Sequence, residues 1–229
     1  MKYSYSNLSQ YAKCPKAWAA LYRDKSVQRG SSPALERGIK LHEELENALV
    51  EGRYPEPANM PEGTTKLPDG LWDYLLKLRS YQPSNRVRIT PELDYAMDAK
   101  GRACQWNDNN ALLRGKIDVA IELGGDLQPT KAVHIDWKTG KIRPDPLQAD
   151  AYAALAWAQG IPETDFRWVY VEQGESRSQQ TKGKEAWDRV YNLIQKAEHE
   201  LEDPVPRQSF FCRFCPVTWC QFNENPEAE

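Results

Sequence analysis

The sequence contains no apolar run that approaches the roughly 20 residues needed to span a membrane. Residues 1–13 also lack the basic and apolar regions of a secretory signal. Positive charge is not in excess, because 30 Lys and Arg residues stand against 33 Asp and Glu residues, for a formal net charge of −3. This balance argues against a histone-like coat of positive charge but leaves room for a local basic groove beside an acidic site. We therefore expect a cytoplasmic protein without a membrane segment.

Cysteine is scarce and odd in number, with five residues in the whole chain. In a reducing cytoplasm, clustered cysteines more often hold metal or perform redox chemistry than form disulfides. Cys212, Cys215 and Cys220 form a C-x2-C-x4-C pattern, and Cys14 supplies a possible fourth thiolate. Four thiolates suit either an iron–sulfur cluster or a structural zinc ion. Cys104 has no partner in the sequence and is expected to be a plain thiol.

Helical signals dominate the N-terminal third of the chain. Ser6 is expected to cap the first helix, and Ser32 to cap a longer one that stops at Gly52. Helices are expected over residues 6–13, 16–23, 33–51, 71–78, 144–159 and 185–201. The segment rich in Pro and Gly at 52–70 is expected to be a connecting loop.

The pattern changes to period two after Pro83. Alternating apolar and polar residues predict three successive strands, around 87–97, 113–121 and 133–137. A fourth strand is expected at 166–173, and the polar stretch at 174–184 is expected to be a flexible loop or hairpin tip. The order of helices, strands, helix, strand and helix indicates an α/β fold.

Two of the predicted strands contain acidic residues. Asp136 and Lys138 lie on one face of their strand, because side chains two positions apart point the same way. On the strand before it, Asp118 lies opposite a buried face that is expected to hold Ile117 and Val119. If the strands pair, both aspartates converge on one Mg²⁺ or Mn²⁺ ion, which suits phosphodiester hydrolysis. Taken alone, an Asp-x-Lys triplet is more often a pair of solvent-exposed side chains without a catalytic role.

Helical residues are candidates to complete this site. His42 lies mid-way along an apolar stripe, and imidazole is a common metal ligand, although such a histidine is more often a hydrogen-bonded core residue. The stripe is expected to consist of Leu35, Ile39, Leu45 and Leu49. Glu46, one turn after His42, is a weaker candidate. Gln148 and Tyr152 share one helix face at i, i+4 spacing, which an ordinary amphipathic face explains equally well.

Five segments, in order, resemble the RecB-like branch of the PD-(D/E)XK nucleases and together cover nearly the whole chain: SYSNLSQYAKCPKAW, RGIKLHEEL, GKIDVA, HIDWKTGK and QADAY. The resemblance implies a metal site formed by His42, Asp118, Asp136 and the main-chain carbonyl of Trp137. It implies that Lys138 positions or helps deprotonate the attacking water, and that Gln148 and Tyr152 orient DNA and the lysine. Glu92 contributes a carboxylate in some relatives, and the sequence does not place it.

The same resemblance implies a restriction-endonuclease-like fold, with a central mixed sheet flanked by helices. We expect a single domain over 1–229, with a mainly helical part at 1–85, a nuclease core at 86–202 and a cluster-binding tail at 203–229 that packs with Cys14. The one upstream cysteine and the C-terminal triplet are similar to the iron–sulfur site of CRISPR-associated RecB-like exonucleases and phage homologues. This similarity favours a 4Fe-4S cluster over zinc, since a zinc ribbon would show two C-x-x-C pairs.

The implied function is a metal-dependent DNA exonuclease in recombination, repair, phage DNA processing or CRISPR adaptation. A catalytically silent DNA-binding or assembly subunit and a structure-specific endonuclease are the alternatives. Expected partners are DNA with single-stranded character or free ends, and a recombination, helicase or CRISPR-adaptation protein. Basic residues and two aromatic residues suit phosphate contacts and base stacking, although surface or core roles explain most of them as well: Lys13, Lys16, Arg37, Lys141, Arg143, Arg207, Arg213, Trp18 and Phe214.

Overall fold

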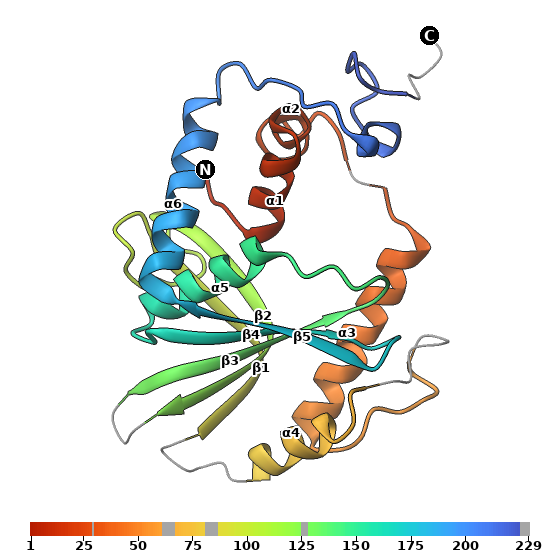
Figure 1. The fold of residues 1–229 in the computed structure, drawn as a ribbon, viewed down its shortest axis with the longest axis vertical. Coiled ribbons are helices and arrows are strands. Elements are labelled where there is room, and N and C mark those ends of the chain that lie inside the picture. Colours follow the sequence, from red (N-terminus) through yellow and green to blue (C-terminus); the bar gives the residue numbers. More distant parts are fainter. Residues whose placement is uncertain (29, 61–66, 81–86, 125–127, 225–229) are drawn as a thin grey trace.

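The computed structural model describes residues 1–28, 30–60, 67–80, 87–124 and 128–224. Parts of the expected 52–70 loop, Pro83 itself and the end of the expected tail lie outside these residues. The elements follow the chain in this order (Figure 1): α1 (Tyr5–Lys13), α2 (Pro15–Trp18), a π-helical turn η1 (Ala19–Arg23), α3 (Pro33–Glu51), α4 (Leu71–Ser80), β1 (Val87–Asp98), β2 (Ala111–Gly124), β3 (Pro129–Lys138), α5 (Pro146–Ala158), β4 (Glu163–Tyr170), β5 (Glu175–Lys182), α6 (Gly183–His199) and a 3-10 turn η2 (Phe210–Phe214). None of the helices within the described ranges is long and apolar enough to cross a membrane.

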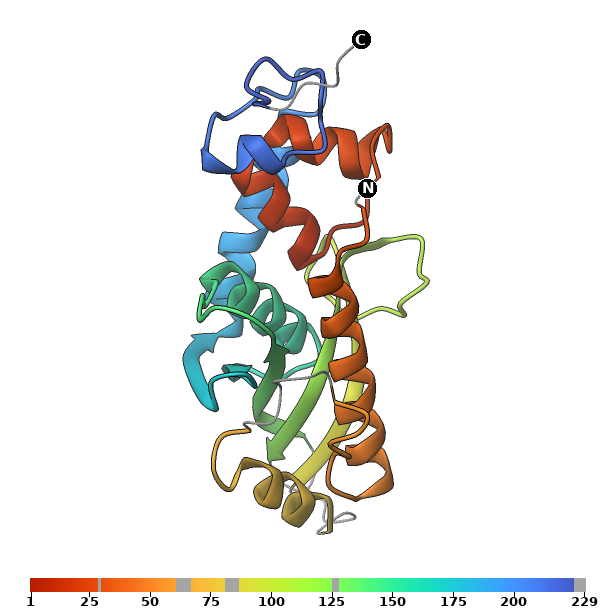
Figure 2. The ribbon, with the colours of Figure 1, turned by 90° about the vertical axis from the view of Figure 1, so that its right-hand side faces the viewer.

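The strands form one mixed sheet in the order β1-β2-β3-β4-β5. The pairs β1–β2, β2–β3 and β4–β5 are antiparallel, whereas β3 and β4 are parallel and are connected by α5. Two apolar cores cover the two faces of this sheet: one packs against α1, α5 and α6, and the other against α3 and α4. Figure 2 shows α3 and α5 on opposite sides of the strands. The predicted mixed sheet with flanking helices is confirmed.

The loop or hairpin tip predicted at 174–184 is wrong, because most of this segment is the edge strand β5. It pairs with β4 from Glu163↔Lys182 to Tyr170↔Glu175. Nearly all of its side chains are exposed, and only Thr181 is buried. A polar edge strand shows no apolar alternation, so its backbone pairing leaves no signal in the sequence. The fourth strand itself also begins three residues earlier than predicted, at Glu163.

Helix starts are only partly predictable. Ser32 caps α3 as expected, since its side chain accepts the Leu35 N–H at 3.2 Å, and Gly52 ends the helix in a left-handed conformation with φ 74°. The first helix is capped by Ser4, not Ser6, because the Ser4 hydroxyl accepts the Asn7 N–H at 3.3 Å. Two serines of equal capping ability stand two positions apart, so local chemistry does not choose between them.

Only the C-terminal half of α3 packs on the sheet. Leu45 and Leu49 are buried, whereas Leu35 and Ile39 are 53% and 49% exposed. The predicted continuous inward stripe is therefore wrong over its first two turns, because that part of α3 has no layer to cover it among the described residues. His42 lies at the transition between the exposed and the buried halves.

Candidate active site

Strands β2 and β3 separate at the residues that the sequence singled out. Their ladder runs to the pair Val119↔Ile135, while β3 continues to pair with β4 as far as Lys138↔Tyr170. Beyond that point the Trp137 N–H donates to the Asp118 carboxylate, Oδ2, at 2.8 Å. The Asp118 carboxylate thus takes the place of a main-chain oxygen of β2 as the acceptor for β3. The β2–β3 ladder has ended at this point, and we call the space between the two strands beside Asp118 the gap.

Strand β2 changes phase at this gap. Ile117 packs in the core on the α5 side and Val119 in the core on the α3 side, so the prediction that both lie on one face is wrong. The ladder to β1 passes from Pro91↔Val119 to Leu93↔Ile117, and Glu92 between them has a left-handed backbone with φ 50°. A left-handed residue breaks the regular alternation of a strand. Asp118 is therefore turned toward the gap.

His42 reaches the gap from α3. Its Nδ1 lies 3.2 Å from Asp118 Oδ2, and its Nε2 lies 2.9 Å from the main-chain oxygen of Trp137. Burial lowers the pKa of His42, but the hydrogen bond and negative charge of Asp118 outweigh it, so the pKa stands above its ordinary value. His42 is thus half-buried at the gap, and each of its two ring nitrogens lies close to an oxygen atom of β2 or β3.

Asp136 and Lys138 lie at the end of β3 and contact each other, with Lys138 Nζ 2.7 Å from Asp136 Oδ2. From α5 on the other face, Gln148 Nε2 donates to Asp136 Oδ1 at 2.6 Å, and Gln148 Oε1 accepts the Trp168 indole N–H at 2.8 Å. Burial and the nearby charge of Asp118 raise the pKa of Asp136 to about 6, against the opposing effect of Lys138. Two carboxylates therefore share a poorly solvated space.

Tyr152 contacts the neighbouring strand and not Asp136. Its hydroxyl donates to the main-chain oxygen of Lys116 at 2.8 Å, and its ring stacks on Phe166 with centroids 5.4 Å apart. A Cβ at Gly115 would lie 2.8 Å from the Tyr152 ring, so the glycine permits this close approach of α5 to β2. Gln148 and Tyr152 do share a helix face, but they support different strands.

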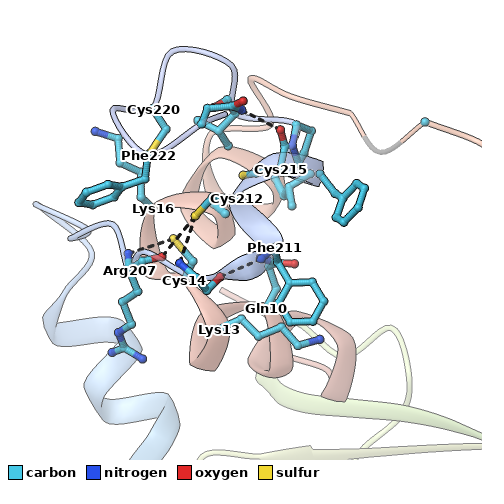
Figure 3. A pocket seen from close by; sticks show the side chains of 18 residues that line it. Gln10, Lys13, Cys14, Lys16, Arg207, Phe211, Cys212, Cys215, Cys220 and Phe222 are labelled. Atoms are coloured by element: carbon cyan, nitrogen blue, oxygen red, sulfur yellow. Dashed lines mark hydrogen bonds between the residues drawn. The ribbon is translucent and has the colours of Figure 1, made fainter. Parts of the chain in front are cut away.

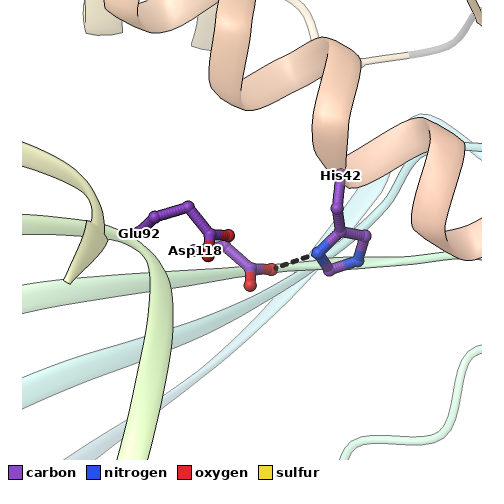
Figure 4. Close-up of side chains that lie close together, drawn as sticks. All are labelled: His42, Glu92 and Asp118. Atoms are coloured by element: carbon purple, nitrogen blue, oxygen red, sulfur yellow. Dashed lines mark ion pairs between the residues drawn. The ribbon is translucent and has the colours of Figure 1, made fainter. Parts of the chain in front are cut away.

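Glu92 is the residue that the sequence could not place. One ligand atom each from His42, Glu92 and Asp118 lie within 4.8 Å of one another, which makes a possible metal site (Figure 4). Glu92 also forms an ion pair with Lys116. Its place follows from the antiparallel register of β1 and β2, in which Glu92 lies between the residues that pair with Val119 and with Ile117. Among the described residues, Asp136 forms no group of this kind with any two of these three, although its charge interacts with those of Asp118 and His42.

The comparisons with known proteins agree with this geometry. The family model of the PD-(D/E)XK nuclease superfamily matches residues 2–221. The chain belongs to this superfamily. Its members use divalent metal ions, and membership implies DNA as the substrate.

Two individual proteins show how far this PD-(D/E)XK chain has diverged from its relatives. The "Gene 69 protein" of Mycobacterium phage D29 is 23% identical over 265 residues, covering 94% of each protein. The solved structure "Crystal structure of SSO0001" is similar with a TM-score of 0.54 at 12% identity, covering 97% of this chain and 87% of that one. At this identity the likeness supports the fold alone.

A second group of potential ligands lies at the other end of the PD-(D/E)XK domain. Cys14, at the end of α1, and the three C-terminal cysteines line one pocket of about 390 Å³ (Figure 3). The Arg207 N–H donates to Cys14 Sγ at 3.4 Å, and the Ser209 N–H donates to Cys212 Sγ at 3.3 Å. Burial raises the pKa of Cys215, and the other three thiols add to the effect. Two segments almost the whole chain apart thus meet through their cysteines.

Not every residue expected at these sites is placed to serve there. Trp18 is fully buried and donates its indole N–H to Asn7 at 2.7 Å, so it offers no stacking surface. Arg37 is paired with Glu172 at 2.7 Å. Cys104 lies apart from the other cysteines, between β1 and β2. Glu46 is half-buried, and burial followed by the charge of Glu92 raises its pKa.

Proposed function

We propose that this chain is a divalent-metal-dependent DNA exonuclease of recombination, repair, phage DNA processing or CRISPR adaptation. The observation that supports the proposal best is the meeting of Asp118, Asp136 and Lys138 where β2 and β3 separate, with His42 reaching in from α3. Asp118 and Asp136 are both mostly shielded from water, so their negative charges repel each other, and a cation bound between them would offset this unfavourable interaction. Membership of the PD-(D/E)XK superfamily is consistent with this function.

His42, Asp118, Asp136 and the main-chain oxygen of Trp137 are the proposed ligands of one Mg²⁺ or Mn²⁺ ion. The donor set fits a hard cation, because it offers carboxylate and carbonyl oxygens with one imidazole. The contacts of His42 with Asp118 and with the Trp137 oxygen already bring three of these donors together. Glu92 is a further ligand in this proposal, because it lies within ligand distance of His42 and Asp118.

The remaining residues act on the substrate side or hold the ligands in place. A bound divalent cation supplies charge neutralisation at the phosphodiester. Lys138 places its ammonium group beside Asp136, where it orients the attacking water and stabilises developing negative charge. Gln148 fixes the Asp136 carboxylate and is itself held by Trp168. Tyr152 holds the end of β2 through the Lys116 carbonyl.

The four cysteines are proposed to hold a 4Fe-4S cluster, with structural zinc as the alternative. Four sulfurs around one zinc lie about 3.8 Å apart, given Zn–S bonds of about 2.3 Å. Within the described residues, no three cysteine sulfurs lie within 4.8 Å of one another. This wider spacing around a 390 Å³ pocket suits a cluster better than a single ion. The cluster would act as a structural tie between α1 and the tail.

End-labelled linear DNA and covalently closed circular DNA test the proposed activity. We expect Mg²⁺- or Mn²⁺-dependent loss of the linear substrate alone, because an exonuclease requires a free end. Cleavage of the closed circle would instead identify an endonuclease. Absence of metal-dependent cleavage on both substrates would contradict the proposal and favour a silent DNA-binding subunit.

Replacing Gln148 with leucine is expected to reduce cleavage by about 10- to 100-fold, as for other residues that orient a metal ligand. The variant should also lose stability by about 1–3 kcal/mol, because it leaves the buried Trp168 indole N–H without its acceptor. Initial cleavage rates and thermal unfolding measure the two effects. Gln148→Glu is the informative companion when it is assayed at a pH where the new carboxyl group is ionised, since it then keeps an acceptor for Trp168 but has no hydrogen to donate to Asp136. Wild-type rates in Gln148→Glu would contradict the positioning role.

A further inference from the structure

The C-terminal tail exposes a group of aromatic rings beside the cysteine pocket. Phe210, Phe211, Phe214 and Trp219 are 64%, 54%, 70% and 60% exposed, which makes them the most exposed aromatic side chains of the described residues together with Tyr54. Three of them belong to the single turn η2, where the Phe210 ring lies 5.9 Å from Phe211 and 6.2 Å from Phe214. Contiguous exposed rings of this kind mark an interaction surface, since folding normally buries them. We call the three neighbouring rings of η2, Phe210, Phe211 and Phe214, the tail aromatic patch.

The rings are interleaved with positive charge. The Arg213 guanidinium lies over the Phe210 ring at 3.4 Å and over the Phe214 ring at 5.1 Å. The adjoining pocket is lined by Lys13, Lys16 and Arg207, and no Asp or Glu is among its described lining residues. The chain as a whole has a net charge of −3, so this concentration of basic residues is a local feature of the tail. A surface that combines basic and aromatic residues favours an anionic partner with flat apolar groups.

Single-stranded nucleic acid is the partner with this chemistry. Its phosphates require cations, and its unpaired bases stack on aromatic rings and on arginine, whereas a duplex hides its bases inside. Acidic peptides satisfy the charge but bring no row of flat rings. We propose that the tail aromatic patch binds single-stranded DNA by base stacking. This inference rests on the proposed DNA nuclease function and specifies the form of its substrate.

The position of the patch fits a path to the active site. The tail lies beside α1 and α2 at one end of the molecule, and α3 extends from that end toward the sheet (Figures 1 and 2). The exposed N-terminal half of α3, with Leu35 and Ile39, thus lies between the tail and His42. A strand bound at the patch is consequently held outside the catalytic gap, so the patch contributes to affinity and not to the chemical step.

Binding is measured by fluorescence anisotropy in an Asp136→Asn background, so that cleavage does not interfere. The probes are labelled oligothymidylate, an abasic oligomer of equal length and charge, and a duplex. The test variant is Phe210→Ala with Phe214→Ala, and its conservative counterpart is Phe210→Tyr with Phe214→Tyr. The matched control replaces two exposed apolar residues far from the tail, Val50→Ala with Tyr74→Ala. Iron and zinc contents are measured for each protein.

The alanine pair should bind oligothymidylate at least about tenfold more weakly, while the tyrosine pair and the control bind it as before. Without the substitutions, oligothymidylate should bind at least about tenfold more tightly than the abasic oligomer. Unchanged affinity of the alanine pair, or an equal loss for the duplex, would overturn the proposal. The proposal would also be overturned if polyglutamate displaced the labelled oligothymidylate as effectively as unlabelled oligothymidylate does. That result would identify a site for acidic peptides. If the alanine pair loses its bound metal, its weaker binding could come from a disturbed tail. The comparison of oligothymidylate with the abasic oligomer, made on the protein without these substitutions, then decides whether bases are bound by stacking. None of these binding measurements requires DNA cleavage. A negative result for the tail aromatic patch is therefore distinguishable from a negative result for the nuclease activity.

Discussion

Asp136→Asn is expected to reduce metal-dependent DNA cleavage by about 10³-fold or more, equivalent to roughly 4 kcal/mol of transition-state stabilisation. The substitution removes one negative charge from the proposed cation site and uncouples Lys138 from its carboxylate partner. Its amide oxygen still accepts the hydrogen bond from Gln148, so the local packing is preserved. Initial rates on end-labelled linear DNA, with saturating Mg²⁺ or Mn²⁺, measure the effect.

The fold should tolerate this substitution. Burial and the charge of Asp118 disfavour the ionised form of Asp136, so a neutral side chain at this position costs little. We expect the midpoint of thermal unfolding to stay within about 4 °C of the unsubstituted protein, which corresponds to about 1 kcal/mol. Glu175→Gln, at an exposed ion pair on β5, is the control and should keep full activity. Comparable activity in Asp136→Asn and Glu175→Gln would remove Asp136 from the catalytic site.

Cys215→Ser is expected to lower the midpoint of thermal unfolding by at least about 10 °C, or roughly 4 kcal/mol. Loss of one thiolate should release the proposed cluster, and with it the tie between Cys14 and the tail. Apart from the cysteines, the small core at this junction consists of Ala17, Ala20 and Val217, with Val27 partly buried against it. So little apolar surface cannot hold the tail alone. Thermal unfolding and the iron and zinc contents measure the effect.

Cys104→Ser separates this effect from the general loss of a thiol. Cys104 lies outside the cysteine pocket, so its replacement should leave metal content and unfolding temperature nearly unchanged. Iron in the unsubstituted protein, absent from Cys215→Ser, would support the cluster, whereas zinc in the same pattern would support the alternative. Equal unfolding temperatures and no bound metal in either variant would show that the cysteines do not hold a metal.

The parts of the fold that the sequence predicts are those that pack against an apolar core. Strands β1, β2 and β3 contain apolar residues that pack in the two cores, and α3 has both a serine cap and a stop at Gly52. The closeness of Asp136 and Lys138 follows from strand geometry alone. Pairing of β2 with β3 then brings Asp118 alongside. The contact of Asp136 with Lys138 was therefore predictable from residues two apart in sequence, and the approach of Asp118 from the pairing of two successive strands.

The remaining features depend on tertiary structure. Strand β5 has no apolar pattern because β4 alone defines it through main-chain pairing. Glu92 acquires its place only through the register of β1 with β2 and its left-handed backbone. Ile117 and Val119 fall on different faces because β2 changes phase beside Glu92. Trp18 resembles a stacking residue in the sequence, but burial and its bond to Asn7 make it part of the core.

Binding of Mn²⁺, followed by electron paramagnetic resonance in the absence of DNA, tests most directly whether the acidic group in the sheet holds a cation. We predict that Mn²⁺ binds the unsubstituted chain and that Asp118→Asn weakens this binding by about 10-fold or more, because Asp118 contacts both His42 and the Trp137 N–H. Glu175→Gln should bind as the unsubstituted chain does. Equal Mn²⁺ affinity in Asp118→Asn and in the unsubstituted chain would contradict a cation site at this position.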